Sequence, residues 1–81
     1  MDFKGNKYIC SLIDARNDNV YCGLFNSNHD MIGKYTADHI DNIITSLPKD
    51  NIVFVGNGSI IHKEKILNTF HSLASFSDNN S

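Results

Sequence analysis

Two apolar segments joined by a short polar turn constrain the fold of this chain most strongly. Residues 7–14 contain Tyr-Ile-Cys-Ser-Leu-Ile, and residues 20–26 contain Val-Tyr-Cys-Gly-Leu-Phe. Both segments are rich in β-branched and aromatic residues, which favour strands. Between them, residues 15–19 contain two Asn and one Asp, whose short side chains bond to nearby backbone and tolerate positive φ. The sequence therefore predicts a β-hairpin.

The rest of the chain predicts a third strand, then a helix, a strand and a second helix. Residues 31–35 predict a weaker strand, and residues 36–47 an amphipathic helix that is capped by the Thr36 hydroxyl and stopped by Pro48. Residues 51–55 form a continuous apolar run, which is typical of a strand covered on both faces. After a loop at 56–58, helical spacing returns from 66 to 74.

Length and composition limit the class of protein. The chain has 81 residues, enough for one small domain, with 41% hydrophobic and 20% charged residues, which is typical of a globular domain. A net charge of −2 gives no basic excess to hold a phosphate backbone, so direct nucleic-acid binding is disfavoured. No apolar run has the length of a membrane span and no signal peptide is visible. We expect a cytoplasmic protein without membrane contact.

The expected topology brings two distant motifs together. A strand order of 3-2-1-4 places the fourth strand beside the first and parallel to it, because the connection between them contains a helix. The carboxyl ends of parallel strands meet at one edge of a sheet, where ligands tend to bind. Residues 14–16, Asp-Ala-Arg, should therefore lie close to residues 56–58, Gly-Asn-Gly.

These same motifs carry a resemblance to a known family. Ile13-Asp14-Ala15-Arg16, Val20-Tyr21 and Val55-Gly56-Asn57-Gly58 resemble the second domain of bacterial TsaB (YeaZ) proteins, which are glycoprotease-like relatives of peptidase M22. The likeness covers residues 7–70. It implies an α/β mixed sheet of the β-β-β-α-β-α order, the front part of the ribonuclease-H-like unit that actin-like ATPases use twice. We expect 1–6 to be a lead-in, 7–74 a partial domain lacking its fifth strand, final helix and preceding domain, and 75–81 a disordered tail.

The resemblance implies a scaffold and not an enzyme. In the full-length context, TsaB proteins support the tRNA threonylcarbamoyladenosine machinery together with TsaD-like and TsaE-like partners, and the family's dimer contacts are made mainly by the first domain. ATP and a metal belong to the TsaD-like subunit, so no cofactor is expected in this chain. Asp14 is expected to tie the hairpin turn and Tyr21 to pack beneath it, with Arg16 and Asn57 as further structural or interaction residues. An uncovered sheet edge would also favour a homodimer or a swapped dimer. The alternatives are a fragment of an M22-type glycoprotease or hydrolase and a nucleotide-binding actin-like half-domain.

The sequence offers little else that carries chemistry. Gly56 and Gly58 are weak candidates for nucleotide binding, but the hairpin turn has no glycine that would let its backbone approach a phosphate. The four histidines and two cysteines form neither of the spacings typical of zinc sites, and no nucleophile with a partner base is evident, so we predict no metal site and no catalytic residue. Cys10 and Cys22 are expected to be small buried residues rather than a disulfide. The charged run 62–65 is expected to be a solvated first helical turn.

Overall fold

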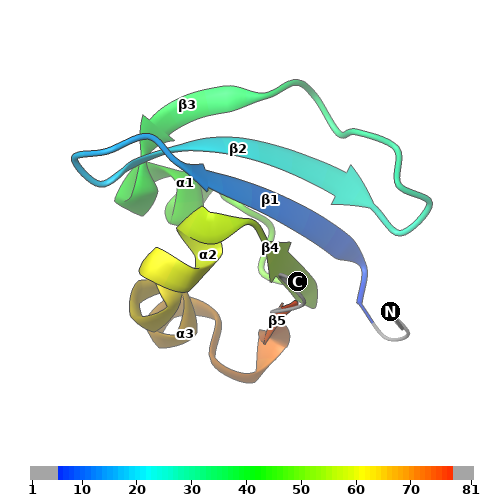
Figure 1. Cartoon of the computed structure of the whole chain (residues 1–81). Coiled ribbons are helices and arrows are strands. Elements are labelled where there is room, and N and C mark those ends of the chain that lie inside the picture. The colour runs from blue at the N-terminus through cyan, green and yellow to red at the C-terminus, as the bar shows by residue number, and fades with distance from the viewer. Residues whose placement is uncertain (1–5, 78–81) are drawn as a thin grey trace.

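The computed structural model describes residues 6–77, which form one five-stranded mixed sheet with three α-helices (Figure 1). The strands are β1 (Tyr8–Asp14), β2 (Asn19–Asn26), β3 (Thr36–His39), β4 (Ile52–Val55) and β5 (Ala74–Phe76), in the order β3-β2-β1-β4-β5. β2 runs antiparallel to both of its neighbours, whereas β4 is parallel to β1 and to β5. The α/β class, the hairpin and the parallel pairing of the first and fourth strands are confirmed.

The helices cover one face of the sheet. α1 (Ile40–Ser46), α2 (Asn57–Ile61) and α3 (Lys63–Phe70) all lie on the same side in Figure 1, and a 3₁₀ turn follows at His71–Leu73. Because side chains alternate along a strand, every second residue points toward these helices. This covered face contributes to a single buried core, which consists of Cys10, Leu12, Val20, Cys22, Ile40, Ile43, Ile44, Leu47, Ile52, Phe54, Ile66 and Phe70.

The second face carries the intervening strand residues. Ile13 lies in register with Tyr21, and Tyr21 with Ala37. Near the hairpin turn this face is open: Ile13 is 45% and Tyr21 55% exposed. Farther along, the Tyr35 ring lies against Gly23, where a Cβ atom would collide with it. The tyrosine thus takes the place of the side chain that Gly23 lacks.

The third strand was predicted in the wrong place. Within residues 31–35 there is only an isolated bridge between Phe25 and Met31, and β3 lies at Thr36–His39. The Asn26 side chain accepts hydrogen bonds from two backbone N–H groups of the turn that follows β2, and Gly33 has a φ of 74°. Both features break an extended conformation, so pairing with β2 resumes only after Gly33.

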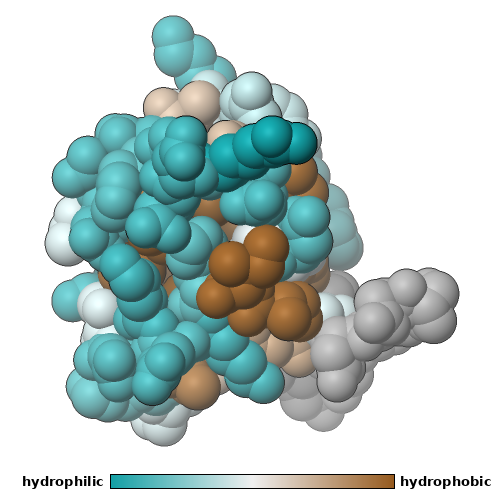
Figure 2. Space-filling view, turned by 60° about the vertical axis from the view of Figure 1, so that its left-hand side comes forward, coloured by the Kyte–Doolittle hydropathy of each residue, from teal (hydrophilic) through white to brown (hydrophobic). Residues whose placement is uncertain are grey.

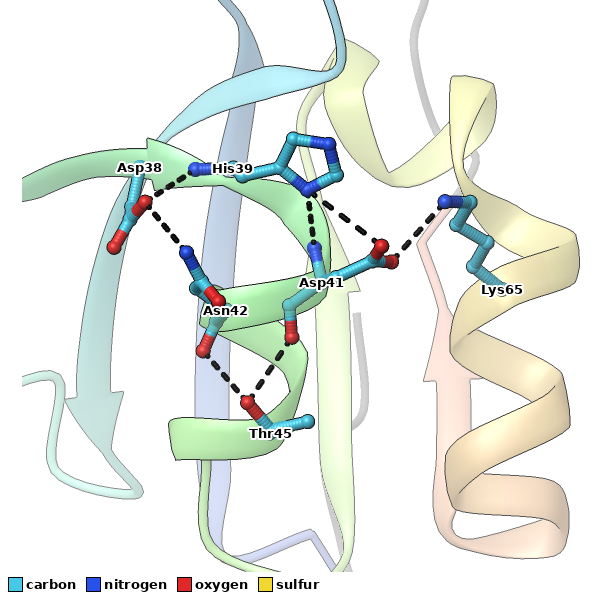
Figure 3. A network of polar contacts seen from close by, with 6 residues as sticks. All are labelled: Asp38, His39, Asp41, Asn42, Thr45 and Lys65. Atoms are coloured by element: carbon cyan, nitrogen blue, oxygen red, sulfur yellow. Dashed lines mark hydrogen bonds and ion pairs between the residues drawn. The ribbon is translucent and has the colours of Figure 1, made fainter.

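The first helix therefore begins later than predicted. Thr36 belongs to β3 and does not cap α1. The N-cap of α1 is His39, whose Nδ1 accepts a hydrogen bond from the Asp41 backbone N–H at 3.1 Å (Figure 3). Lys65 of α3 donates to the Asp41 carboxylate at 3.1 Å, so one acidic side chain links the two helices. The helix ends before Pro48, as expected.

The C-terminal part also departs from the prediction. Residues 57–58 begin α2 instead of forming a loop, and α3 ends at Phe70 because His71 has a φ of 53°. Ala74–Phe76 then form β5, whose Phe76 ring stacks on Phe54 with 5.7 Å between centroids. The fifth strand that we expected to be missing is thus present, and the tail prediction is wrong for 75 and 76. Residues 78–81, and 1–5 of the predicted lead-in, lie outside the described residues. No helix within 6–77 is long and apolar enough to cross a membrane.

Candidate functional site

The carboxyl ends of β1 and β4 meet at one edge of the sheet. The Asp14 backbone N–H donates a hydrogen bond of 2.9 Å to Oδ1 of Asn57, a residue 43 positions later in the chain. Asn57 is the first residue of α2, which begins directly after β4 and Gly56. The predicted meeting of residues 14–16 with residues 56–58 is therefore confirmed. We call this region the β1–β4 edge.

Gly56 and Gly58 are needed for close packing at this edge. Gly56 has a φ of 92°, which favours glycine, and a Cβ atom there would collide with the Leu12 carbonyl oxygen. A Cβ atom on Gly58 would lie 2.9 Å from the same oxygen and 3.1 Å from the Leu12 Cβ. The glycines therefore let α2 begin in direct contact with β1. This packing accounts for both glycines without a bound nucleotide.

The hairpin turn is strained, and Asp14 holds it. Arg16, Asn17 and Asp18 have φ values of 72°, 55° and 64°. The left-handed region costs a non-glycine residue of order 1 kcal/mol, less for Asn and Asp. The Asp14 carboxylate accepts the Arg16 backbone N–H at 3.2 Å, and the Asp18 carbonyl accepts the Ile40 N–H at 2.7 Å. Asp14 thus ties the turn as expected, through the Arg16 backbone, while the Arg16 side chain is exposed.

Tyr21 does not pack beneath the turn. Its ring is 55% exposed on the second face, where it helps to line a shallow depression of about 390 Å³ together with Ala15, Asn19, Ala37 and Asp38. Val20 and Cys22 on either side of it are buried in the core, so alternation along the strand turns Tyr21 outward. The expectation taken from the family resemblance, that Tyr21 packs beneath the turn, is therefore wrong. The position of Tyr21 between two apolar residues of a strand already indicated that its side chain points away from the core.

Most polar groups of this edge are engaged within the protein. No three His, Cys, Asp or Glu side chains within residues 6–77 come close enough together to hold a metal ion. The Asp14 carboxylate is engaged by backbone, and Asn57 uses its carbonyl oxygen within the protein. What remains at the surface is a strained backbone turn, the Arg16 side chain and exposed apolar groups.

Exposed isoleucines form the part of this region that sequence reasoning missed. Ile60 and Ile61 of α2 are 52% and 58% exposed, and the Ile13 side chain lies beside Gly56, where α2 begins. Figure 2 shows a compact group of hydrophobic side chains at the centre of a largely hydrophilic face, with smaller hydrophobic spots around it. The adjacent Ile-Ile pair was a usable signal, because successive side chains of an α-helix point about 100° apart, so a helix packed through a narrow face leaves such a pair largely exposed. We call Ile13, Ile60 and Ile61 the isoleucine surface.

His62 was also misjudged. It was expected in a solvated charged turn, yet it is only 6% exposed and its Nε2 atom has no hydrogen-bond partner. Its backbone N–H caps the C-terminus of α2, and its carbonyl accepts a hydrogen bond from the Ile66 backbone N–H. His62 therefore connects the two short helices α2 and α3. The rest of the run is exposed as expected, and Lys63 lies 5.0 Å above the Phe76 ring.

Comparison with known proteins gives no family to this chain: no protein-family model matches it, and no similar sequence or structure was found among curated proteins or solved structures. The site is therefore defined by the geometry of the β1–β4 edge and by the side chains around it.

Proposed function

We propose that this chain is the second domain of a TsaB-like scaffold subunit that supports tRNA threonylcarbamoyladenosine formation without catalytic residues of its own. One observation carries the proposal. The hydrogen bond between Asp14 and Asn57 joins the two motifs on which the resemblance rests, although they are far apart in the sequence. The parallel pairing of β1 with β4 brings these strand ends together, so the contact supports the domain topology that the resemblance implies.

The sheet topology supports the same proposal. A ribonuclease-H-like unit continues its 3-2-1-4 order with a fifth strand, and β5 lies beside β4 and parallel to it. The match of order and direction favours an actin-like ATPase domain over an arbitrary α/β sheet. Fold alone does not define function, so the argument for a scaffold depends on the surface.

The isoleucine surface provides what a scaffold needs. Ile13, Ile60 and Ile61 are each about half exposed beside the β1–β4 edge, and burying such side chains against a partner is favourable by about 25 cal/mol for each Å² of apolar area. Exposed apolar groups that cluster on a polar surface mark interaction sites. In the proposed role the partners are TsaD-like and TsaE-like proteins in the cytoplasm, and the TsaD-like protein supplies the ATP and metal chemistry.

A domain exchange tests this proposal. Residues 6–77 replace the second domain of an established TsaB protein, and the chimera is mixed with its TsaD and TsaE partners, ATP, threonine-derived donor and tRNA. We expect the chimera to bind its partners and to restore tRNA modification to within tenfold of the parent protein. A chimera that is folded by circular dichroism but restores neither binding nor modification would overturn the proposal.

A matched pair of variants of the chimera tests whether the isoleucine surface contacts the partner proteins. The double variant with Ile60→Asp and Ile61→Asp should abolish partner binding and tRNA modification by the chimera, because it places charge where apolar contact is required. Asn68→Asp adds a charge to an exposed polar position of α3 and should leave activity unchanged. Light scattering of the 81-residue chain alone addresses the homodimer: a dimer that the isoleucine variants dissociate would assign this surface to a second copy instead of the TsaD-like partner.

A further inference from the structure

Two buried thiols face one another inside the hairpin. The Sγ atoms of Cys10 on β1 and Cys22 on β2 are 3.7 Å apart, and both cysteines are reduced. The strand register pairs Leu12 with Cys22 and Cys10 with Leu24, so the two cysteines are diagonal neighbours on the covered face. A disulfide requires about 2.05 Å between its sulfur atoms. The two sulfur atoms must therefore move less than about 2 Å closer together before they can bond.

We propose that Cys10 and Cys22 form a peroxide-sensitive latch, which closes as an intramolecular disulfide between β1 and β2. The pair has the two requirements of such a device, a sulfur that can be oxidised and a second sulfur in contact with it. The two residues are 12 positions apart, so the closed bridge would span the strained turn and hold the Asp14 end of β1 to β2.

The environment distinguishes the roles of the two sulfurs. When the Cys10 thiol donates to the Cys22 sulfur, this hydrogen bond lowers the pKa of Cys22 against the opposing effect of burial. The same hydrogen bond and burial raise the pKa of Cys10. Cys22 keeps 5% of its surface exposed whereas Cys10 is fully buried, so Cys22 is the sulfur that peroxide reaches first and Cys10 is the resolving sulfur.

The chemistry balances with hydrogen peroxide as the oxidant. The Cys22 thiolate attacks one peroxide oxygen, the O–O bond breaks, and the departing hydroxide takes up the proton that Cys22 had released, which gives Cys22 sulfenic acid and water. The Cys10 sulfur then attacks the Cys22 sulfur, the S–O bond breaks, and hydroxide leaves with the Cys10 proton as a second water molecule. In sum, two thiols and one peroxide give one disulfide and two water molecules.

Burial selects for a small oxidant. Cys10 is fully buried and Cys22 is only 5% exposed, so a small oxidant such as hydrogen peroxide should reach the sulfur far more readily than a bulky disulfide such as oxidised glutathione. Closing the bridge restricts the unfolded chain and should therefore stabilise the fold. The latch would fix the hairpin, and with it the β1–β4 edge, under oxidising conditions.

Intact-mass measurement tests the latch on the 81-residue chain. The native protein is exposed to hydrogen peroxide, treated with catalase, denatured and alkylated with N-ethylmaleimide. We expect a monomer that has lost two hydrogen atoms and takes up no alkylating reagent, a higher urea midpoint, and full reversal by dithiothreitol. Cys10→Ala should instead retain oxygen on Cys22 without loss of two hydrogens, since no resolving sulfur is present.

Several results would overturn the latch. Alkylation of both thiols after peroxide treatment, addition of oxygen to a cysteine without a bridge, or a disulfide between two chains would each contradict it. Peroxide treatment of the same protein in urea is the internal control if the alanine variant does not fold: a bridge that forms faster in urea than in buffer would show that the native fold does not place the sulfurs for reaction.

Discussion

The two faces of the sheet contain similar residues, but one face is buried under helices and the other is partly exposed to solvent. On β1, Leu12 is fully buried against the helices, whereas the next residue, Ile13, is 45% exposed on the second face. Both are apolar and of similar size, so hydrophobicity alone does not decide which face becomes the core. The helices decide it, because α1 and α3 supply the side chains that close over the covered face.

The contrast has a functional meaning. The covered face is buried by packing within the domain and offers no apolar surface to a partner. The exposed end of the second face, with Ile13 and Tyr21, and the adjacent isoleucines of α2 remain available for contact. Stability should therefore depend mainly on the covered face, and binding on the exposed end of the second face and its margin.

Truncating the neighbouring residues Leu12 and Ile13 gives the largest expected difference. Leu12→Ala removes a fully buried side chain and should lower the free energy of unfolding by about 3 kcal/mol, from lost burial and the cavity that remains. Ile13→Ala should cost about 1 kcal/mol or less, since much of its surface is already in water. Urea denaturation followed by circular dichroism measures both. Equal losses would show that the second face is packed as tightly as the covered face.

Two glycines with similar backbone angles sharpen the comparison. Gly56 at the β1–β4 edge and Gly33 in the exposed β2–β3 connection have φ values of 92° and 74°. A Cβ atom would collide with Leu12 at the first position and meet nothing within 4 Å at the second. Gly33→Ala should therefore cost about 1 kcal/mol through backbone strain alone, and Gly56→Ala about 3 kcal/mol because overpacking is added.

The difference between the two glycine variants, from urea denaturation midpoints, isolates the packing contribution of the β1–β4 edge. If Gly56→Ala were as mild as Gly33→Ala, α2 would be able to move away from β1. The hydrogen bond between Asp14 and Asn57 would then be a weak constraint, and the argument for the proposed function would lose its main support.

The sequence predicted those parts of the fold that depend on local composition or on topology. Segments rich in β-branched and aromatic residues around a polar turn predicted β1 and β2, and the helix between strands predicted a parallel β4, so the Asp14–Asn57 contact followed. It could not predict β3, whose Thr-Ala-Asp-His sequence is exposed and has no apolar pattern. It also missed β5, since the aromatic contact between Phe76 and Phe54 joins positions that no local pattern connects.

His62 is the polar exception among the buried residues. Ser59 is fully buried as well, but its hydroxyl donates to the Gly56 carbonyl at 2.6 Å, whereas the His62 Nε2 atom has no partner. An unsatisfied buried polar group costs about 1–3 kcal/mol. His62→Leu should therefore raise the free energy of unfolding by about 1 kcal/mol, measured by thermal and urea denaturation. His62→Gln has a similar size but keeps a polar group, and it should bring no gain. A loss of stability in His62→Leu would show that the imidazole makes a favourable contact through its other nitrogen.

The smallest expected effect lies where the edge strand β3 meets α1. Hydrogen bonds from the Asn42 side chain and the His39 backbone hold the pKa of the Asp38 carboxyl below its usual value (Figure 3). A lowered pKa in the folded state means that Asp38 contributes stability above the ordinary pKa of aspartate, and that this contribution is lost as the pH falls through the lower, folded value. Carbon-detected NMR titration of the carboxyl should show this pKa, and Asn42→Ala should move it toward the ordinary value. Asp38 is fully exposed to solvent, so salt should weaken the effect. A pKa that Asn42→Ala leaves unchanged would mean that the bond seen in Figure 3 does not persist in solution, and that β3 is joined to α1 by the backbone alone.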